Sequence, residues 1–114
     1  MARSVRWAET ACDDLEQIAQ YIERDSESYA ASFVAEILEA ARSLADFAER
    51  GRVVPELNEP SVRELLVGNY RLVYEIRQEA IYVLGVIHGA RQLGRLWSRE
   101  TRPGNKNDAG PAAT

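Results

Sequence analysis

The sequence predicts an α+β fold in which a small antiparallel sheet carries a helical hairpin on one face. Three observations predict it: an alternating run opens the chain, two amphipathic helical patterns follow, and three strand-like runs come after a polar loop. The expected order is β-α-α-β-β-β, with a short helix or arm after the last strand. At 114 residues the chain is long enough for one domain with a single modest core.

The first half of the chain is predicted to hold one strand and both helices. Residues 4–7 alternate and form the strand, and Thr10 followed by Asp13 resembles a capping pattern at the start of the first helix. Residues 24–26 break the pattern and can cap the second helix. The apolar residues recur at helical spacing: Ala8, Ala11, Cys12, Leu15, Ile18, Ala19 and Ile22, then Ala30, Phe33, Val34, Ile37, Leu38, Ala41, Leu44, Ala45 and Ala48. The short link between them predicts an antiparallel pair.

The second half of the chain is predicted to hold three strands joined by hairpins. Gly51 ends the second helix, and Pro55 and Pro60 mark a polar loop. The strands are expected at residues 62–67, 70–77 and 80–88, with links short enough for tight turns. Because the last run is apolar on both faces, we expect it in the interior of the sheet.

Composition limits the class of protein. Residues 1–100 are expected to form the domain, with a helix or arm at 89–99, and the polar, breaker-rich residues 101–114 a disordered tail. No apolar run approaches the roughly 20 residues that cross a bilayer, and a signal-peptide core is missing, so a cytoplasmic protein without a membrane partner is predicted. One cysteine and one histidine exclude an internal disulfide and give no metal pattern, so we expect neither metal nor cofactor.

The net charge of −4 conceals an asymmetry between the two halves. Residues 1–60 contain thirteen acidic and six basic residues, a balance of −7, and residues 61–114 contain five and eight, a balance of +3. Two interpretations stay open. The C-terminal half presents a surface to an anionic or acidic partner, or the helices simply carry acidic solvent-facing sides.

Arginines near the ends of the predicted core strands are the residues best suited to binding or chemistry. Strand alternation places Arg71 on the sheet face opposite the helices, with Arg63 on the neighbouring strand. His88 and Arg91 lie at the exit of the last strand. Guanidinium groups that converge suit phosphate or carboxylate recognition, and an imidazole can act as an acid or a base near neutral pH.

A structural interpretation of the same residues also stays open. In it, Arg63 and Arg71 pair with Glu64 and Glu75, and His88 only hydrogen-bonds the backbone at a strand end.

These segments together resemble the RelE/ParE toxin superfamily of bacterial type II toxin–antitoxin systems. The resemblance covers about residues 5–97. It lies in the opening strand, the first helix, Gly51-Arg52 with Pro55, Val62-Arg63-Glu64-Leu65, Gly68-Asn69-Tyr70-Arg71-Leu72-Val73-Tyr74 and Ile87-His88-Gly89-Ala90-Arg91. It implies the fold described above and a partner antitoxin whose extended C-terminal segment wraps the toxin.

The superfamily contains two activities, and the resemblance can be tested against them. RelE-like members are metal-independent endonucleases that cut mRNA on the ribosome, using basic residues to activate the 2′-hydroxyl, stabilise charge and protonate the leaving oxygen. ParE-like members inhibit DNA gyrase. Arg71 and Arg91 match two arginines of the nucleases. However, the nucleases carry a pair of lysines where this chain has Val62 and Glu64. They also carry a tyrosine near the C-terminus where this chain has Trp97, whose indole cannot exchange a proton in that role.

The resemblance therefore implies a ParE-like toxin that binds gyrase and traps its cleaved-DNA state, with a non-enzymatic mode of action favoured. It implies antitoxin contacts at Arg63, Arg71 and Arg91, and target contacts at Arg91, Arg95 and Trp97. Two rivals stay open: a ribosome-dependent mRNA endonuclease that uses Arg71, His88 and Arg91, and a non-toxic module that only binds its partner or co-represses its operon.

Overall fold

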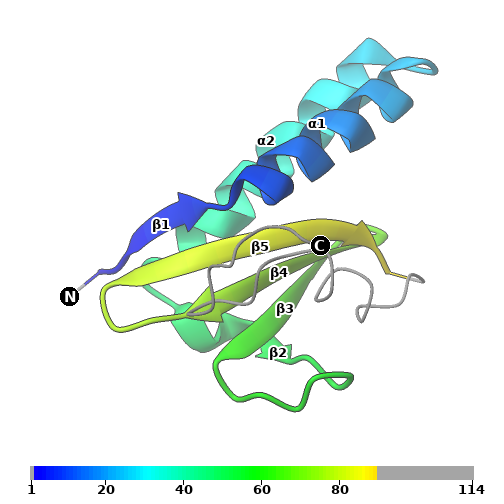
Figure 1. The fold of residues 1–114 in the computed structure, drawn as a ribbon. Coiled ribbons are helices and arrows are strands. Elements are labelled where there is room, and N and C mark those ends of the chain that lie inside the picture. The colour runs from blue at the N-terminus through cyan, green and yellow to red at the C-terminus, as the bar shows by residue number, and fades with distance from the viewer. Residues whose placement is uncertain (1, 90–114) are drawn as a thin grey trace.

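The computed structural model describes residues 2–89 (Figure 1). Within that range, five strands form one sheet in the order β1-β5-β4-β3-β2. The elements in chain order are β1 (Ser4–Trp7), α1 (Glu9–Glu23), α2 (Glu27–Ser43), the 3-10 turn η1 (Ala48–Arg50), β2 (Arg52–Val53), β3 (Val62–Val67), β4 (Tyr70–Ile76) and β5 (Ala80–His88). The predicted α+β fold is confirmed, with both helices on one face of the sheet.

The sheet differs from the prediction in two details. β1 runs parallel to β5, with Ser4 opposite Ala80 and Trp7 opposite Val83, so the sheet is mixed rather than wholly antiparallel. After β1 the chain passes through both helices and then through β2, β3 and β4. The last strand, β5, follows β4 and lies beside β1, running in the same direction. β2 adds a short antiparallel edge to β3 and was not expected, because two residues in a polar loop carry no strand pattern. β5 lies between β1 and β4, as predicted.

The helix starts are set by different contacts. The predicted cap at Thr10 is wrong: α1 begins at Glu9 after Ala8, which makes no side-chain capping bond. Ala8 instead donates its backbone N–H to the Val83 carbonyl oxygen at 2.9 Å, so the pairing of β1 with β5 continues up to the helix. The cap of the second helix is confirmed, since the Ser26 hydroxyl accepts from the Tyr29 N–H at 3.1 Å.

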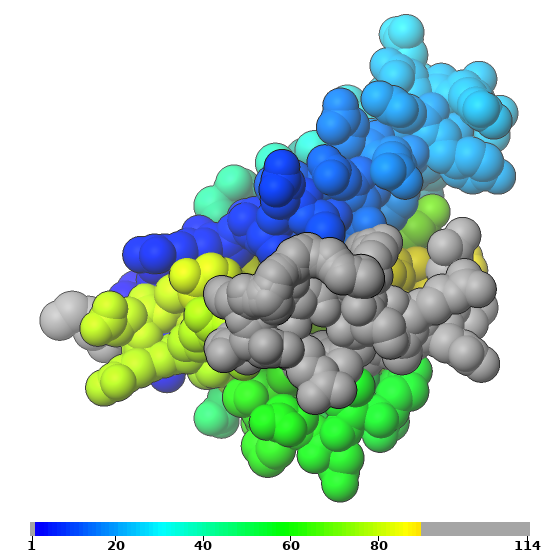
Figure 2. Space-filling model, viewed as in Figure 1, coloured from blue at the N-terminus to red at the C-terminus, as the bar shows by residue number. Residues whose placement is uncertain are grey.

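The main core lies between the helical hairpin and the sheet. It contains Ala11, Phe33, Ile37, Ala41 and Leu44 from the helical half together with Leu72, Tyr74, Ile81, Val83 and Val86 from β4 and β5. The hairpin extends past the edge of the sheet, and in the space-filling view its blue and cyan residues project as a ridge (Figures 1 and 2). Among residues 2–89, no helix is long and apolar enough to cross a membrane.

A bulge in β5 changes which of its apolar residues face the helices. Val73 lies opposite Gly85 but Tyr74 lies opposite Val83, so Leu84 is an extra residue. Val83 and Val86 therefore both pack toward the helices, although strict alternation would put them on opposite faces. Leu84 joins Val54, Val62 and Val73 in a second, smaller cluster on the opposite face, which we call the open face.

The expected C-terminal arm at residues 90–99 and the tail at residues 101–114 lie outside the described residues. Their predicted structure, and the domain boundary at residue 100, stay predictions.

Candidate functional site

The β3–β4 hairpin sets the position of the candidate site. Gly68 has a φ of 60°, which favours glycine, and begins the two-residue turn that connects the strands. The resulting register places Glu64 opposite Val73 and Leu66 opposite Arg71. Because Val62 and Val73 belong to the open-face cluster, strand alternation puts Glu64, Leu66 and Arg71 on that same face. The prediction that Arg71 lies opposite the helices is confirmed.

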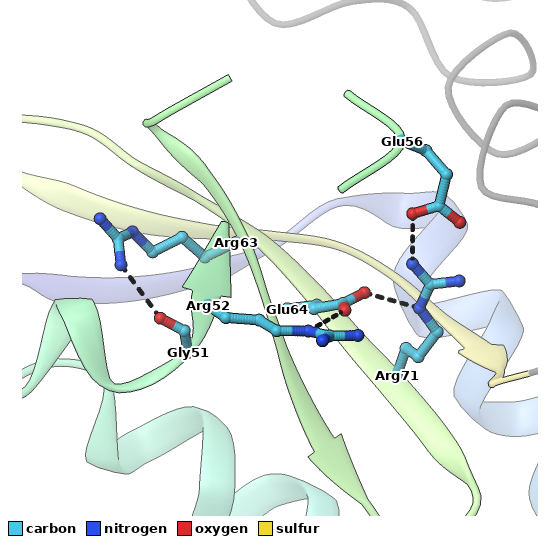
Figure 3. A network of polar contacts seen from close by, with 6 residues as sticks. All are labelled: Gly51, Arg52, Glu56, Arg63, Glu64 and Arg71. Atoms are coloured by element: carbon cyan, nitrogen blue, oxygen red, sulfur yellow. Dashed lines mark hydrogen bonds and ion pairs between the residues drawn. The ribbon is translucent and has the colours of Figure 1, made fainter. Parts of the chain in front are cut away.

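Four charged side chains form a connected group on this face, the Arg71 network: Arg52, Glu56, Glu64 and Arg71 (Figure 3). The Glu64 carboxylate accepts from Arg71 Nε through Oε1 and from Arg52 Nε through Oε2, each at 2.6 Å. Arg71 Nη2 also donates to Glu56 Oε1 at 2.9 Å. Glu64 and Arg71 are only 1% and 5% exposed. Among these four side chains, two cations thus meet two carboxylates.

Arg71 stays a cation inside this network. Burial by itself would lower its pKa, but the hydrogen bonds and ion pairs with Glu56 and Glu64 outweigh burial and raise the pKa above its ordinary value. A guanidinium held in this way can hold an anion by charge and hydrogen bonds, but it does not give up its proton.

The structure separates two arginines that the sequence suggested might converge. Arg63 lies opposite Tyr74 in the register and donates to the carbonyl oxygens of Gly51, at 3.0 Å from Nη1, and Pro60. The predicted pairing of Arg71 with Glu64 is confirmed. The alternative in which Arg63 pairs with Glu64 or Glu75 is wrong, because Glu64 pairs with Arg52 and Arg71 and Glu75 pairs with Arg77 at 2.7 Å.

His88 lies at the end of β5 and is exposed. Its ring contacts Tyr70 edge-on, with centroids 5.4 Å apart, and Tyr70 packs in turn on Phe33. The bulge in β5 gives His88 this position. The remaining predicted site residues, Arg91, Arg95 and Trp97, lie outside the described residues, so their roles stay predictions.

An open groove of about 600 Å³ runs beside the Arg71 network. It brings Arg71 and His88 to one surface, as expected from their positions at the ends of neighbouring strands. The lining residues are Arg52, Pro55, Glu56, Leu66, Gly68, Asn69, Arg71, His88 and Gly89. Leu66 is 61% exposed there. The groove therefore combines charge with an uncovered apolar side chain.

A second groove of about 510 Å³ lies between α1 and the ends of β4 and β5. Its lining mixes apolar and aromatic side chains with polar ones: Asp14, Gln17, Ile18, Tyr21, Tyr70, Val86, Ile87 and His88. Tyr21 is 65% exposed. His88 belongs to both grooves, so the two surfaces meet at the end of β5.

Tyr74 fixes the segment that carries Arg52. Its buried hydroxyl donates to the Ala48 carbonyl oxygen at 2.8 Å and accepts from the Gly51 N–H at 2.9 Å. Burial raises the pKa of Tyr74, so the hydroxyl stays neutral over the physiological range. Because Gly51 precedes Arg52, these two bonds place the strand from which Arg52 reaches Glu64.

Sequence reasoning did not identify Glu56 and Arg52 as site residues. Both contact the network across loops, over separations of 15 and 12 residues along the chain. For Glu56 the available signal was an acidic residue directly after Pro55, which fits an ordinary solvated loop equally well. For Arg52 it was the Gly51-Arg52 pair in the resemblance, which assigns it no contact. Among residues 2–89, no three His, Cys, Asp or Glu side chains are grouped in a way that could hold a metal ion.

Comparison with known proteins gives one family and a set of similar folds. The family model described as "ParE toxin of type II toxin-antitoxin system, parDE" matches residues 5–93. A structure of the chromosomal ParDE system from P. aeruginosa is similar with a TM-score of 0.63 and 23% identity, covering 76% of this chain and 96% of that chain. The RelBE2 toxin–antitoxin complex from Mycobacterium tuberculosis is similar with a TM-score of 0.57 and 26% identity, covering 77% and 99%. No curated protein sequence matches the chain.

Proposed function

The chain belongs to the ParE toxin family of type II toxin–antitoxin systems, and from that premise we propose that it inhibits DNA gyrase and is neutralised by a cognate antitoxin. The observation that carries the proposal is the Arg71 network. It favours action by binding over cleavage of RNA, which is the activity of the other branch of the superfamily.

RNA cleavage requires a cation available to the reacting phosphate and neighbouring groups that move protons. Arg71 is 5% exposed and engaged by two carboxylates. Glu64 stands where the resemblance places a lysine, so a negative charge replaces a positive one beside Arg71. A positioned acid or base contributes about 10²–10⁴ in rate, and a carboxylate at this position also repels the phosphate. The arrangement supports a scaffold that binds and does not cleave.

Two surfaces support an antitoxin partner. The groove beside α1 offers apolar and aromatic side chains to an amphipathic helix, with Tyr21 and Tyr70 as candidate anchors. The groove beside the Arg71 network suits an extended acidic segment, for which Arg71 supplies a cation. Arg63 and Arg91 are proposed as further contacts to acidic side chains. Two of the similar structures are described as toxin–antitoxin systems, which also favours this proposal.

The proposed contacts to gyrase are Arg91, Arg95 and Trp97, since the C-terminal half carries the positive balance of charge. We expect the R91A/W97A double variant to require at least about tenfold more protein for half-maximal inhibition of gyrase supercoiling, as expected when a Trp and an Arg at an interface centre are truncated. R42A, which removes an exposed arginine from α2, is the matched control and should inhibit like the wild type. Equal inhibition by both variants would remove these residues from the target interface.

The purified full-length chain separates the proposed function from its rivals. We expect it to inhibit supercoiling by gyrase and to accumulate cleaved DNA, while leaving mRNA intact on translating ribosomes in a toe-printing assay. Codon-specific mRNA cuts with unaffected supercoiling would establish the endonuclease instead. A chain that is harmless when expressed without its partner and inactive in both assays would establish the binding module.

A further inference from the structure

The two carboxylates that hold Arg71 differ in how firmly the fold fixes them. Glu64 belongs to β3, its side chain is 0% exposed, and both its oxygens accept from arginines at 2.6 Å. Glu56 belongs to the loop between β2 and β3, and its side chain is 41% exposed. Breaking a buried pair is costly, whereas a pair open to water contributes little. Glu64 is thus a permanent partner of Arg71, and Glu56 is an exchangeable one.

The charge balance of the network changes by one unit when Glu56 leaves. With Glu56 in place, Arg52 and Arg71 are matched by Glu56 and Glu64. Within these four side chains, the departure of Glu56 leaves two guanidinium groups and one carboxylate. A single incoming carboxylate restores the balance and can accept the hydrogen bond that Arg71 Nη2 gives to Glu56.

The surroundings of Arg71 also provide an apolar contact. Leu66 is the cross-strand partner of Arg71, and such side chains stand about 5 Å apart on one face of a sheet. Leu66 is 61% exposed and lines the same groove as Arg71 and Glu56. A ligand that places a carboxylate at Arg71 can therefore cover Leu66 with a neighbouring apolar group.

We propose that Glu56 is a resident competitor at Arg71, which an acidic side chain of the antitoxin displaces while an adjacent apolar side chain of the antitoxin packs on Leu66. The inference rests on the proposed function, because it states how the same partner is recognised. An acidic protein segment fits better than a nucleic acid. A carboxylate on a protein segment and a phosphate could each replace Glu56, but a phosphate backbone offers no apolar group to cover the exposed Leu66.

Removing the competitor without disturbing the rest of the site tests this inference. We compare E56Q with E59Q, which removes the same charge from the same loop at an exposed residue. The first probe is sodium acetate. Its binding to the full-length chain is measured by NMR from the change in the Arg71 Nε–H resonance. The competing ion pair corresponds to a few tenths to about 1 kcal/mol, so E56Q should bind acetate about two- to fivefold more tightly than E59Q.

The second probe is the purified protein encoded by the gene beside this one, measured by calorimetry. E56Q should bind it about two- to fivefold more tightly than E59Q, and adding L66A to E56Q should weaken it again. Equal affinities of E56Q and E59Q for both probes would overturn the inference, as would a short poly-uridine RNA that binds E56Q more tightly than the neighbouring protein does.

The test of the exchange at Arg71 and the test of gyrase inhibition can succeed or fail independently of each other. Gyrase inhibition is measured on the wild-type chain, and neither loop variant alters residues 91–97. A chain that leaves gyrase unaffected, but whose E56Q variant gains affinity for acetate and for the neighbouring protein, would refute the target and support the exchange at Arg71.

Discussion

Glu64→Gln is expected to lower the free energy of unfolding by about 3–5 kcal/mol, as when one partner of a buried ion pair is removed. Each carboxylate oxygen of Glu64 accepts from an arginine Nε at 2.6 Å. An amide presents an NH₂ group to one of those donors, and the Arg71 cation loses the buried one of the two carboxylates that compensate its burial. Because a domain of this size has a total stability of about 5–15 kcal/mol, much of the population should unfold under mild denaturation.

Urea denaturation of the variants measures this effect. Glu59→Gln is the control, since Glu59 is exposed, and it should stay within about 0.5 kcal/mol of the wild type. The double variant E64L/R71M removes both charges together and should recover to within about 1 kcal/mol of the wild type, because apolar side chains of similar volume replace a buried pair well. An E64Q curve that overlays the E59Q curve would show that Glu64 does not compensate the buried charge.

Gly51→Ala is expected to cost about 3 kcal/mol, since it combines overpacking with the loss of a buried hydrogen bond. A Cβ at residue 51 would lie 2.5 Å from the Glu64 carbonyl oxygen and 2.6 Å from the Tyr74 hydroxyl oxygen. Either β3 or Tyr74 must move, and both hold the segment that carries Arg52. The backbone of Gly51 is extended, with φ −80° and ψ 167°, so the demand at this position is for space alone.

Gly68→Ala is the matched control for this prediction. Gly68 has a φ of 60°, and no atom lies within 4 Å of the place that the Cβ of an alanine would occupy. Alanine there therefore meets backbone strain of about 1–2 kcal/mol without a clash. We expect the urea midpoint of Gly51→Ala to lie below that of Gly68→Ala. The reverse order would show that the contact between Gly51, Glu64 and Tyr74 relaxes easily.

Periodicity predicted the elements of this fold because burial repeats regularly along the chain. Helical stripes and strand alternation located the first helix and the three long strands to within one residue. The predicted end of the second helix at Gly51 is wrong, because α2 ends at Ser43 and the apolar residues that continue the stripe lie in a turn and in η1. Three features escaped periodicity because they depend on contacts between distant segments. The parallel pairing of β1 depends on where β5 lies, β2 forms only against β3, and the bulge at Leu84 exists only relative to β4.

The candidate site was predictable in part for the same reason. Alternation placed Arg71 on the open face, and the nearby acidic residues on the neighbouring strand suggested its pairing with Glu64. Glu56 and Arg52 were not predictable, because a loop and a two-residue edge strand bring them to Arg71. Arg63 was placed beside Arg71 by sequence order alone, yet it lies one residue from Glu64 and so points to the other face of β3.

The central claim is that Arg71 is a buried cation paired with Glu56 and Glu64, and that the proposed inhibition of gyrase does not require it. The most direct measurement is the concentration of folded E64L/R71M that half-inhibits gyrase supercoiling. The account predicts a value within about twofold of the wild type, because the variant keeps the scaffold and residues 91–97 and loses only the charge pair. A folded E64L/R71M that no longer inhibits gyrase would contradict it and make Arg71 part of the toxic surface.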